Sequence, residues 1–200
     1  MRKFMVGITG ASGSIFADRL IEVLLMQGHE VFLVVTSNGE KVSIFELETP
    51  FETLMEKYRK LAESYRGRIT VCPNNDMFSS IASGSVKVDA MIIVPCSMGT
   101  LGKIAHGISD SLLIRAADVA VKEHRKLVLV TRETPLSSIH LENMLKLSRL
   151  GVIMMPPVPA FYSKPTTLDE SINLSVGRIL DTINVENSYH KRWGESDENE

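Results

Sequence analysis

The sequence has little cysteine, little net charge and no long apolar run. Its two cysteines, Cys72 and Cys96, have no metal-like spacing, which argues against a disulfide framework and favours a reducing compartment. The formal net charge of −2 gives no sign of a nucleic-acid or membrane partner. No apolar run reaches the ~20 residues that span a bilayer, and the opening apolar stretch is too short for a signal peptide. We therefore expect a soluble, cytoplasmic protein.

The composition is that of a folded domain. Hydrophobic residues make up 44% of the 200 residues and charged residues 23%, enough apolar material for a sizeable core. The last six residues, ESDENE, include four acids. We expect a single α/β domain over residues 1–187, with a C-terminal arm and a disordered acidic tail over residues 188–200.

Short apolar runs alternate with helical patterns along the chain. Because the strands are almost continuously apolar, they predict a parallel sheet covered on both faces. Right-handed crossovers then give a three-layer, doubly wound, Rossmann-like fold. The predicted strands are 3–8, 31–35, 69–71, 90–94, 127–130 and 152–155, and the predicted helices are 14–27, 39–45, 51–66, 101–105, 111–124, 138–150 and a last helix to 183 that opens with a Thr167/Glu170 capping box.

Polar and glycine-rich clusters follow the predicted strands. In open α/β sheets, ligands bind beyond the carboxyl ends of the strands, so these clusters predict a single site at one edge. The clusters are 9–13, 36–37, 96–100, 131–133 and the region of Pro159 and Tyr162.

The first of these clusters suits a phosphate. Gly10 and Gly13 allow backbone N–H groups at a helix start to approach an anion, and Ser12 adds a hydroxyl. The alternative is an ordinary tight turn with a serine helix cap.

Charged residues suggest a second anionic group. Arg115 and Lys122 are seven residues apart, hence on one helix face, and we expect them to converge with Arg132 and Glu133 on one anionic ligand. The alternative is a solvated ladder in which Asp118 pairs with both cations. Glu133 would then pair with Arg132 or cap a helix. No His/Asp/Glu cluster has metal-site spacing.

Several segments together resemble one family. GITGASGS, PCSMGTLGKIAHG, RAADVAVKEHR, VTRETP and the late Arg-Trp pair are similar to the UbiX-type flavin prenyltransferases from about residue 2 to 194. That family was once described as aromatic-acid or 3-polyprenyl-4-hydroxybenzoate decarboxylases. The resemblance implies an enzyme that joins reduced FMN to dimethylallyl phosphate without a metal. The product, prenylated FMN, is the cofactor of a UbiD-type decarboxylase. It also implies a homo-oligomer, a dodecamer.

The resemblance also implies roles for individual residues. It assigns catalysis to Ser12, Glu46, Lys122 and Glu133. It assigns the prenyl phosphate to Arg115, Lys122, Tyr162, Arg178 and Trp193. It assigns FMN to Gly10, Ala11, Ser12, Thr36, Ser97, Met98, Gly99, Thr100 and Arg132.

Two positions depart from the family pattern. The family has Ser-Lys where this chain has Thr36-Ser37, and Glu-Thr-Asp where it has 46–48, Glu-Leu-Glu. Two other functions stay open at this point. One is a flavin-dependent decarboxylase of the peptidyl-cysteine type, although its loop contains an asparagine that PCSMGT lacks. The other is an FMN carrier without chemistry.

Overall fold

Six strands form one parallel sheet in the order β3-β2-β1-β4-β5-β6. The computed structural model describes residues 1–189. The contacts divide the described residues into two compact units, residues 1–157 and residues 158–189. A single domain over residues 1–187 stays a prediction. The strands are β1 Lys3–Ile8, β2 Glu30–Val35, β3 Arg68–Val71, β4 Ala90–Cys96, β5 Leu127–Thr131 and β6 Ile153–Met154.

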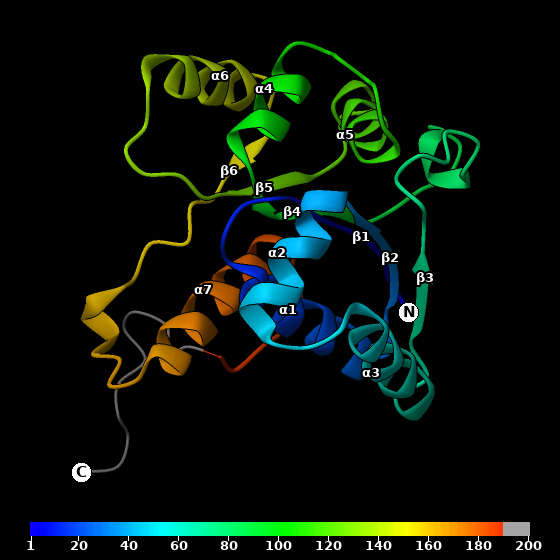
Figure 1. Ribbon diagram of the computed structural model, residues 1–200, viewed down its shortest axis with the longest axis vertical. Coiled ribbons are helices and arrows are strands. Elements are labelled where there is room, and N and C mark those ends of the chain that lie inside the picture. Colours follow the sequence, from blue (N-terminus) through cyan, green and yellow to red (C-terminus); the bar gives the residue numbers. More distant parts are fainter. Residues whose placement is uncertain (190–200) are drawn as a thin grey trace. The chain divides into compact units, whose positions relative to one another are not determined.

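Helices cover both faces of the sheet (Figure 1). One face carries α1 and α3, and the other carries α4, α5 and α6. Alternate strand residues, among them Met5, Phe32 and Met91, share a buried cluster with residues of α4 and α5. The helices of this unit are α1 Ser14–Met26, α2 Ser37–Leu47, α3 Phe51–Ser64, η1 Ser80–Ala82, α4 Met98–Ala105, α5 Leu112–Lys122 and α6 Ser138–Arg149.

The strand order confirms the predicted doubly wound fold. From β1 the chain winds outward to β2 and β3, then returns to the other side of β1 and continues through β4, β5 and β6. β1 therefore pairs with both β2 and β4, all in parallel. The winding reverses between β1 and β4, and in such sheets a crevice for ligands opens at that point, outside the carboxyl ends of the strands.

Two helices begin earlier than the apolar periodicity predicts, because hydroxyl side chains cap them. The Thr36 Oγ1 atom accepts the Gly39 N–H at 3.0 Å, so α2 begins at Ser37 rather than near Gly39. The Ser97 Oγ atom accepts the Thr100 N–H at 3.3 Å, so α4 begins at Met98. A cap replaces an intrahelical acceptor, so no apolar residue is needed in the first turn.

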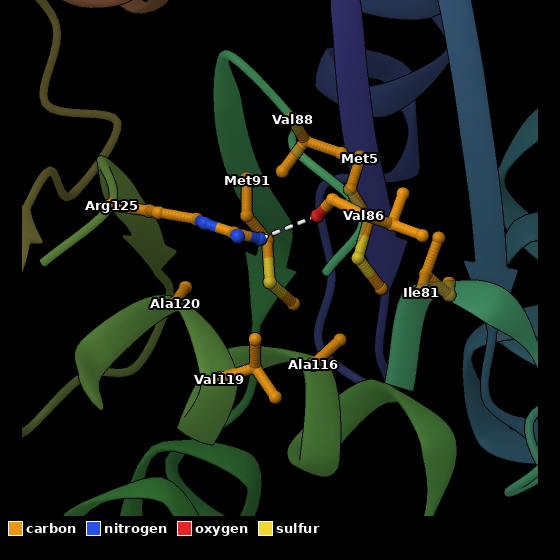
Figure 2. A pocket seen from close by; sticks show the side chains of 9 residues that line it. All are labelled: Met5, Ile81, Val86, Val88, Met91, Ala116, Val119, Ala120 and Arg125. Atoms are coloured by element: carbon orange, nitrogen blue, oxygen red, sulfur yellow. Dashed lines mark hydrogen bonds between the residues drawn. The ribbon is translucent and has the colours of Figure 1, made fainter. Parts of the chain in front are cut away.

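Asn74 and Arg125 help to tie the irregular segment between β3 and β4 to the rest of its unit. The Asn74 backbone carbonyl and Oδ1 accept the first two α5 amides, from Leu112 at 2.8 Å and Leu113 at 3.0 Å. The Arg125 guanidinium donates to the Val86 carbonyl at 2.6 Å (Figure 2). It also donates to the Gly84 carbonyl. The apolar hollow beside Arg125 is about 10 Å³, room for no more than a water molecule.

The second unit contains η2 (Phe161–Ser163) and α7 (Leu168–Thr182). The Thr167 side chain accepts the Glu170 N–H and the Glu170 carboxylate accepts the Thr167 N–H, which confirms the predicted capping box. The acidic tail and Trp193 lie outside the described residues. In the part of the chain that the structure describes, no helix is both long and apolar enough to cross a membrane.

Candidate active site

A cleft of about 340 Å³ opens where the winding of the sheet reverses. Loops that follow β1, β2 and β4 line it, together with the start of α5 and the segment after β3. Five residues that the resemblance assigns to FMN line this cleft: Gly10, Thr36, Ser97, Gly99 and Thr100. The structure therefore brings together residues from three separate loops of the sequence.

A buried threonine fixes two of these loops relative to each other. The Thr9 Oγ1 atom donates to the Pro95 carbonyl at 2.8 Å and accepts the Ser97 N–H at 2.8 Å. Thr9 is 1% exposed, so these two bonds are shielded from competing water. The loops after β1 and β4 are therefore held in place at the mouth of the cleft.

The cleft lies at the N-terminal ends of α2 and α4. Thr36 and Ser97, the caps of these helices, both line it. The N-terminal end of a helix carries a partial positive charge and N–H groups without intrahelical partners. Two such ends at one cleft suit an anion such as a phosphate.

Glycines permit the close approach of the first two loops. A Cβ atom on Gly10 would lie 2.6 Å from the Asn38 Cβ, and one on Gly39 would lie 2.6 Å from the Ile8 carbonyl oxygen. A Cβ on Gly99, by contrast, would meet nothing within 4 Å. Gly10 and Gly39 are therefore needed for packing, whereas Gly99 faces open space.

The Glu46 carboxylate lies against the start of α1, where the sequence predicts that backbone amides contact a phosphate. It accepts the Gly13 N–H at 2.9 Å and the Ser14 N–H at 2.8 Å. The amides that we expected to approach a phosphate are thus satisfied by the chain itself. The reason is that α2 places Glu46, 32 residues beyond Ser14 in the sequence, against this helix end.

The surroundings of Glu46 favour its charged form. Burial raises the pKa of Glu46, but hydrogen bonds from the Ser12 side chain and from the Ser14 and Gly13 backbone outweigh burial and lower the pKa below its ordinary value. Glu46 is therefore a carboxylate at neutral pH. Ser12 and Glu46, both assigned to catalysis by the resemblance, are in contact.

The end of β5 carries Arg132 and Glu133 on the same edge of the sheet as the cleft. β5 pairs with β4 up to Thr131 opposite Cys96, so both side chains follow next to the Ser97 loop. Both are exposed. The Glu133 carboxylate accepts the Thr134 N–H at 3.0 Å.

Ala11 and Met98, assigned to FMN by the resemblance, are mostly buried. Ala11 is 8% exposed and Met98 9%, and the Met98 side chain belongs to the core cluster against α4 and α5. A ligand would therefore contact mainly the backbone N–H and C=O groups of these two residues.

Neither Arg115 nor Lys122 lines the cleft of its own chain, so the predicted convergence is not seen within one copy. α5 begins at the cleft and runs back toward the start of β4. The Arg115 Nε atom donates to the Ala82 carbonyl at 3.2 Å, in the segment that precedes β4. A Cβ on Gly84, in the same segment, would lie 3.4 Å from the Lys122 Nζ. The seven-residue spacing shows that Arg115 and Lys122 share a helix face, but it does not show which edge of the sheet their side chains lie near.

Both cations have carboxylate partners, as in the alternative interpretation. The Arg115 Nη1 atom lies 2.9 Å from Asp118 Oδ2, and the Lys122 Nζ lies 2.5 Å from Glu123 Oε1. Asp118 pairs with Arg115, whereas the partner of Lys122 is Glu123, which we did not predict. The Lys122–Glu123 pair is exposed and contributes little to stability, whereas the Arg115–Asp118 pair is partly buried.

Tyr162 and Arg178 belong to the second unit. Tyr162 lies in η2 and is 55% exposed. Arg178 lies on α7, where its Nη1 atom is 3.8 Å from Asp181 Oδ2. Trp193 lies outside the described residues.

Sequence reasoning missed an ion pair in the cleft lining. The Lys103 Nζ lies 2.6 Å from Asp110 Oδ2, and both residues line the cleft. Lys103 follows Gly99 by one helical turn, and that spacing was a usable signal. Asp110 carried no such signal, because the turn after α4 brings it back to the cleft.

The thiols are not candidates for nucleophilic chemistry. Burial raises the pKa of Cys96 to about 12. Burial also raises the pKa of Cys72. Thiols of this kind stay protonated and inert at neutral pH.

The doubly wound sheet, with a cleft at the N-terminal ends of two helices, defines a Rossmann-like α/β fold. Residues 1–184 match the family described as Flavoprotein. The flavin prenyltransferase UbiX of Methanocaldococcus jannaschii is 50% identical over 192 residues, covering 96% of this chain and 98% of that protein. The chain belongs to the UbiX family of flavin prenyltransferases.

Solved structures agree with this family. The crystal structure of AnUbiX (PadA1) in complex with FMN and dimethylallyl pyrophosphate is 41% identical with a TM-score of 0.88, covering 96% of this chain and 97% of that one. A dodecameric FMN-dependent UbiX-like decarboxylase from Escherichia coli O157:H7 is 45% identical with a TM-score of 0.84, covering 96% of this chain and 98% of that one.

Proposed function

We propose that the protein joins reduced FMN to dimethylallyl phosphate and releases prenylated FMN. The observation that carries this proposal is the cleft: five residues that the resemblance assigns to FMN line it, in a chain of the flavin prenyltransferase family. FMN is a substrate here, since it leaves as the modified product.

The FMN phosphate would lie between the N-terminal ends of α2 and α4. Unpaired N–H groups and two helix dipoles attract an anion there, and the Thr36 and Ser97 caps hold both helix ends in place. Arg132 and Glu133 share this edge of the sheet and would lie nearer the reacting part of the flavin.

The reaction breaks the carbon–oxygen bond of the prenyl phosphate, and the phosphate leaves with the bonding electrons. Fixed cations stabilise that developing charge without reorganising. The prenyl carbons bond to flavin N5 and C6 to close a new ring. Holding the two substrates in contact supplies proximity. Glu133 or the Ser12–Glu46 pair would move the proton gained or lost as the ring closes, and the lowered pKa of Glu46 suits a base rather than an acid.

The prenyl phosphate cations would come from a second copy of the chain. Arg115 and Lys122 lie beside the segment that leads into β4, and neither is among the residues that line the cleft of their own chain. If these two cations bind the prenyl phosphate, they would bind it at the cleft of a neighbouring copy. A homo-oligomer supplies that arrangement, and the Escherichia coli relative is described as dodecameric.

The product would pass to a UbiD-type decarboxylase in the cytoplasm. The free, buried cysteines agree with a reducing compartment. The AnUbiX complex holds a pyrophosphate, so both the monophosphate and the pyrophosphate are to be compared as donors.

The direct test is anaerobic incubation with reduced FMN and dimethylallyl phosphate, followed by mass and absorbance spectra of the extracted flavin. We expect a gain of one five-carbon unit and the spectrum of a cyclised flavin. Parallel reactions with oxidised FMN, without prenyl donor, and with the pyrophosphate define the substrates. Unchanged FMN in every reaction would favour a carrier, and consumption of a peptidyl-cysteine substrate would favour a decarboxylase.

A further inference from the structure

The Lys103–Asp110 ion pair stands in the wall of the cleft. Its two side chains are about half exposed, at 47% and 46%, and its atoms are 2.6 Å apart. Lys103 follows Gly99 by four residues on α4, hence on the same helix face. Gly99 faces open space, and side chains on a helix lean toward its N-terminal end. The ammonium group is therefore directed toward the same opening as the first turn of α4.

The rest of the cleft lining has no formal charge. Among the described residues that line it, Lys103 is the only cation and Asp110 the only anion, and the others are Gly, Ser, Thr, Asn and Ile. The helix ends attract an anion but offer only partial charges. A phosphate dianion entering this cleft thus meets one full positive charge, on a flexible stem that can move from Asp110 to the ligand.

We propose that Lys103 is a specificity-determining residue that selects phosphorylated flavin over riboflavin. In the empty cleft Asp110 holds the ammonium group at the opening. When FMN binds, the ammonium contacts its 5′-phosphate as a charge-assisted hydrogen-bond donor. Riboflavin, which has no phosphate, gains nothing from this group. The inference rests on the proposed placement of FMN in this cleft.

The test compares Kd values of the whole protein for FMN and riboflavin, measured by quenching of flavin fluorescence. We expect Lys103→Met, which keeps the apolar stem, to raise the Kd for FMN roughly tenfold and to leave that for riboflavin unchanged. Added salt should weaken FMN binding less in this variant than in the parent. Lys103→Arg should keep most of the preference for FMN. Lys60→Met is the matched control, since Lys60 is an exposed lysine on α3.

The outcomes separate this inference from the proposed function. Equal losses for FMN and riboflavin in Lys103→Met, or no loss for either, would overturn the role of Lys103 while the parent still binds FMN. A parent that binds neither flavin would overturn both. A third result would place the ammonium on the prenyl phosphate: unchanged FMN binding with a raised KM for dimethylallyl phosphate alone, which also overturns the inference.

Discussion

At the level of single residues, Glu46 has two functions to reconcile. It caps the start of α1 through two backbone amides, and it contacts Ser12 at the edge of the sheet. The first function stabilises the fold, because a carboxylate at a helix start satisfies unpaired N–H groups and the dipole. The second keeps a charged base beside the proposed reaction.

Replacing Glu46 by Gln should lower the free energy of unfolding by about 1 kcal/mol at pH 7. Since the pKa of Glu46 is lowered in the folded state, its contribution is present above the pKa of an unfolded glutamate, about 4.3, and is lost as the pH falls through the lower folded value. Urea unfolding at pH 7 and pH 3 should therefore show a difference between parent and variant that shrinks in acid. Glu48→Gln, on a neighbouring exposed carboxylate, should show no such difference.

Replacing Glu133 should affect function rather than stability, because Glu133 is exposed and its carboxylate accepts a hydrogen bond from the Thr134 backbone amide. Glu133→Gln keeps size and hydrogen bonding but removes proton transfer, so we expect normal stability and FMN binding with a step slowed by roughly 10²–10⁴-fold. Single-turnover absorbance spectra would show whether an uncyclised prenyl adduct accumulates. Normal formation of the cyclised flavin would leave Glu46 as the main proton carrier.

At the level of elements, the strands were predictable because burial on both faces leaves a continuous apolar run. β1 has the predicted bounds, Lys3–Ile8. The starts of α2 and α4 were not predictable from apolar periodicity. The sequence indicates Thr36 and Ser97 as ligand contacts, whereas their side chains also cap these helices. A hydroxyl next to a cleft can be a cap and a ligand contact together, and sequence alone does not separate the two.

Two glycines in the first turns of these helices should respond differently to the same substitution. Gly39→Ala places a methyl group 2.6 Å from the Ile8 carbonyl oxygen, and the backbone must shift. We expect a loss of about 1–3 kcal/mol in the free energy of unfolding. Gly99→Ala meets open space, and the better helix propensity of alanine should leave stability equal or higher by up to about 1 kcal/mol. Thermal or urea unfolding of both variants tests this contrast, and equal losses would contradict it.

The candidate site was predictable where residues directly follow strands. The sheet topology carries Gly10, Thr36 and Ser97 to one edge, as expected from a parallel fold. Asp110 and Asn74 were not predictable, because they reach the cleft through irregular segments whose course no periodicity encodes. The place of Lys122 beside the segment before β4 was not predictable either, because periodicity gives the face of a helix but not its position along the sheet.

At the level of the whole molecule, one chain does not bring all the assigned groups together. The cleft and the end of β5 share one edge of the sheet, whereas Arg115 and Lys122 lie along the segment before β4. An enzyme that uses all of them needs contact between copies. Activity should then depend on assembly, and dilution or interface mutations that dissociate the oligomer should abolish turnover before they unfold the chain.

Mixed oligomers test this directly. Glu133→Gln and Lys122→Ala should each be nearly inactive alone. Co-expressed, they should regain part of the parental rate, because some sites combine an intact Glu133 from one copy with an intact Lys122 from another. Co-expression of Arg115→Ala with Lys122→Ala is the matched control, since every site would then lack one of the two cations. No recovery in the first mixture, with oligomers verified as mixed, would show that one copy supplies both groups.

The hydrogen bonds from Arg125 to the segment before β4 should affect the resistance of the protein to proteolysis. That guanidinium holds the carbonyls of Gly84 and Val86, and the next residue, Lys87, is exposed. A protease must draw several residues of extended chain into its own cleft, which the held segment resists. Arg125→Gln should therefore make trypsin cut between Lys87 and Val88 under conditions where the parent stays whole, a cleavage that gel mobility and fragment mass would locate.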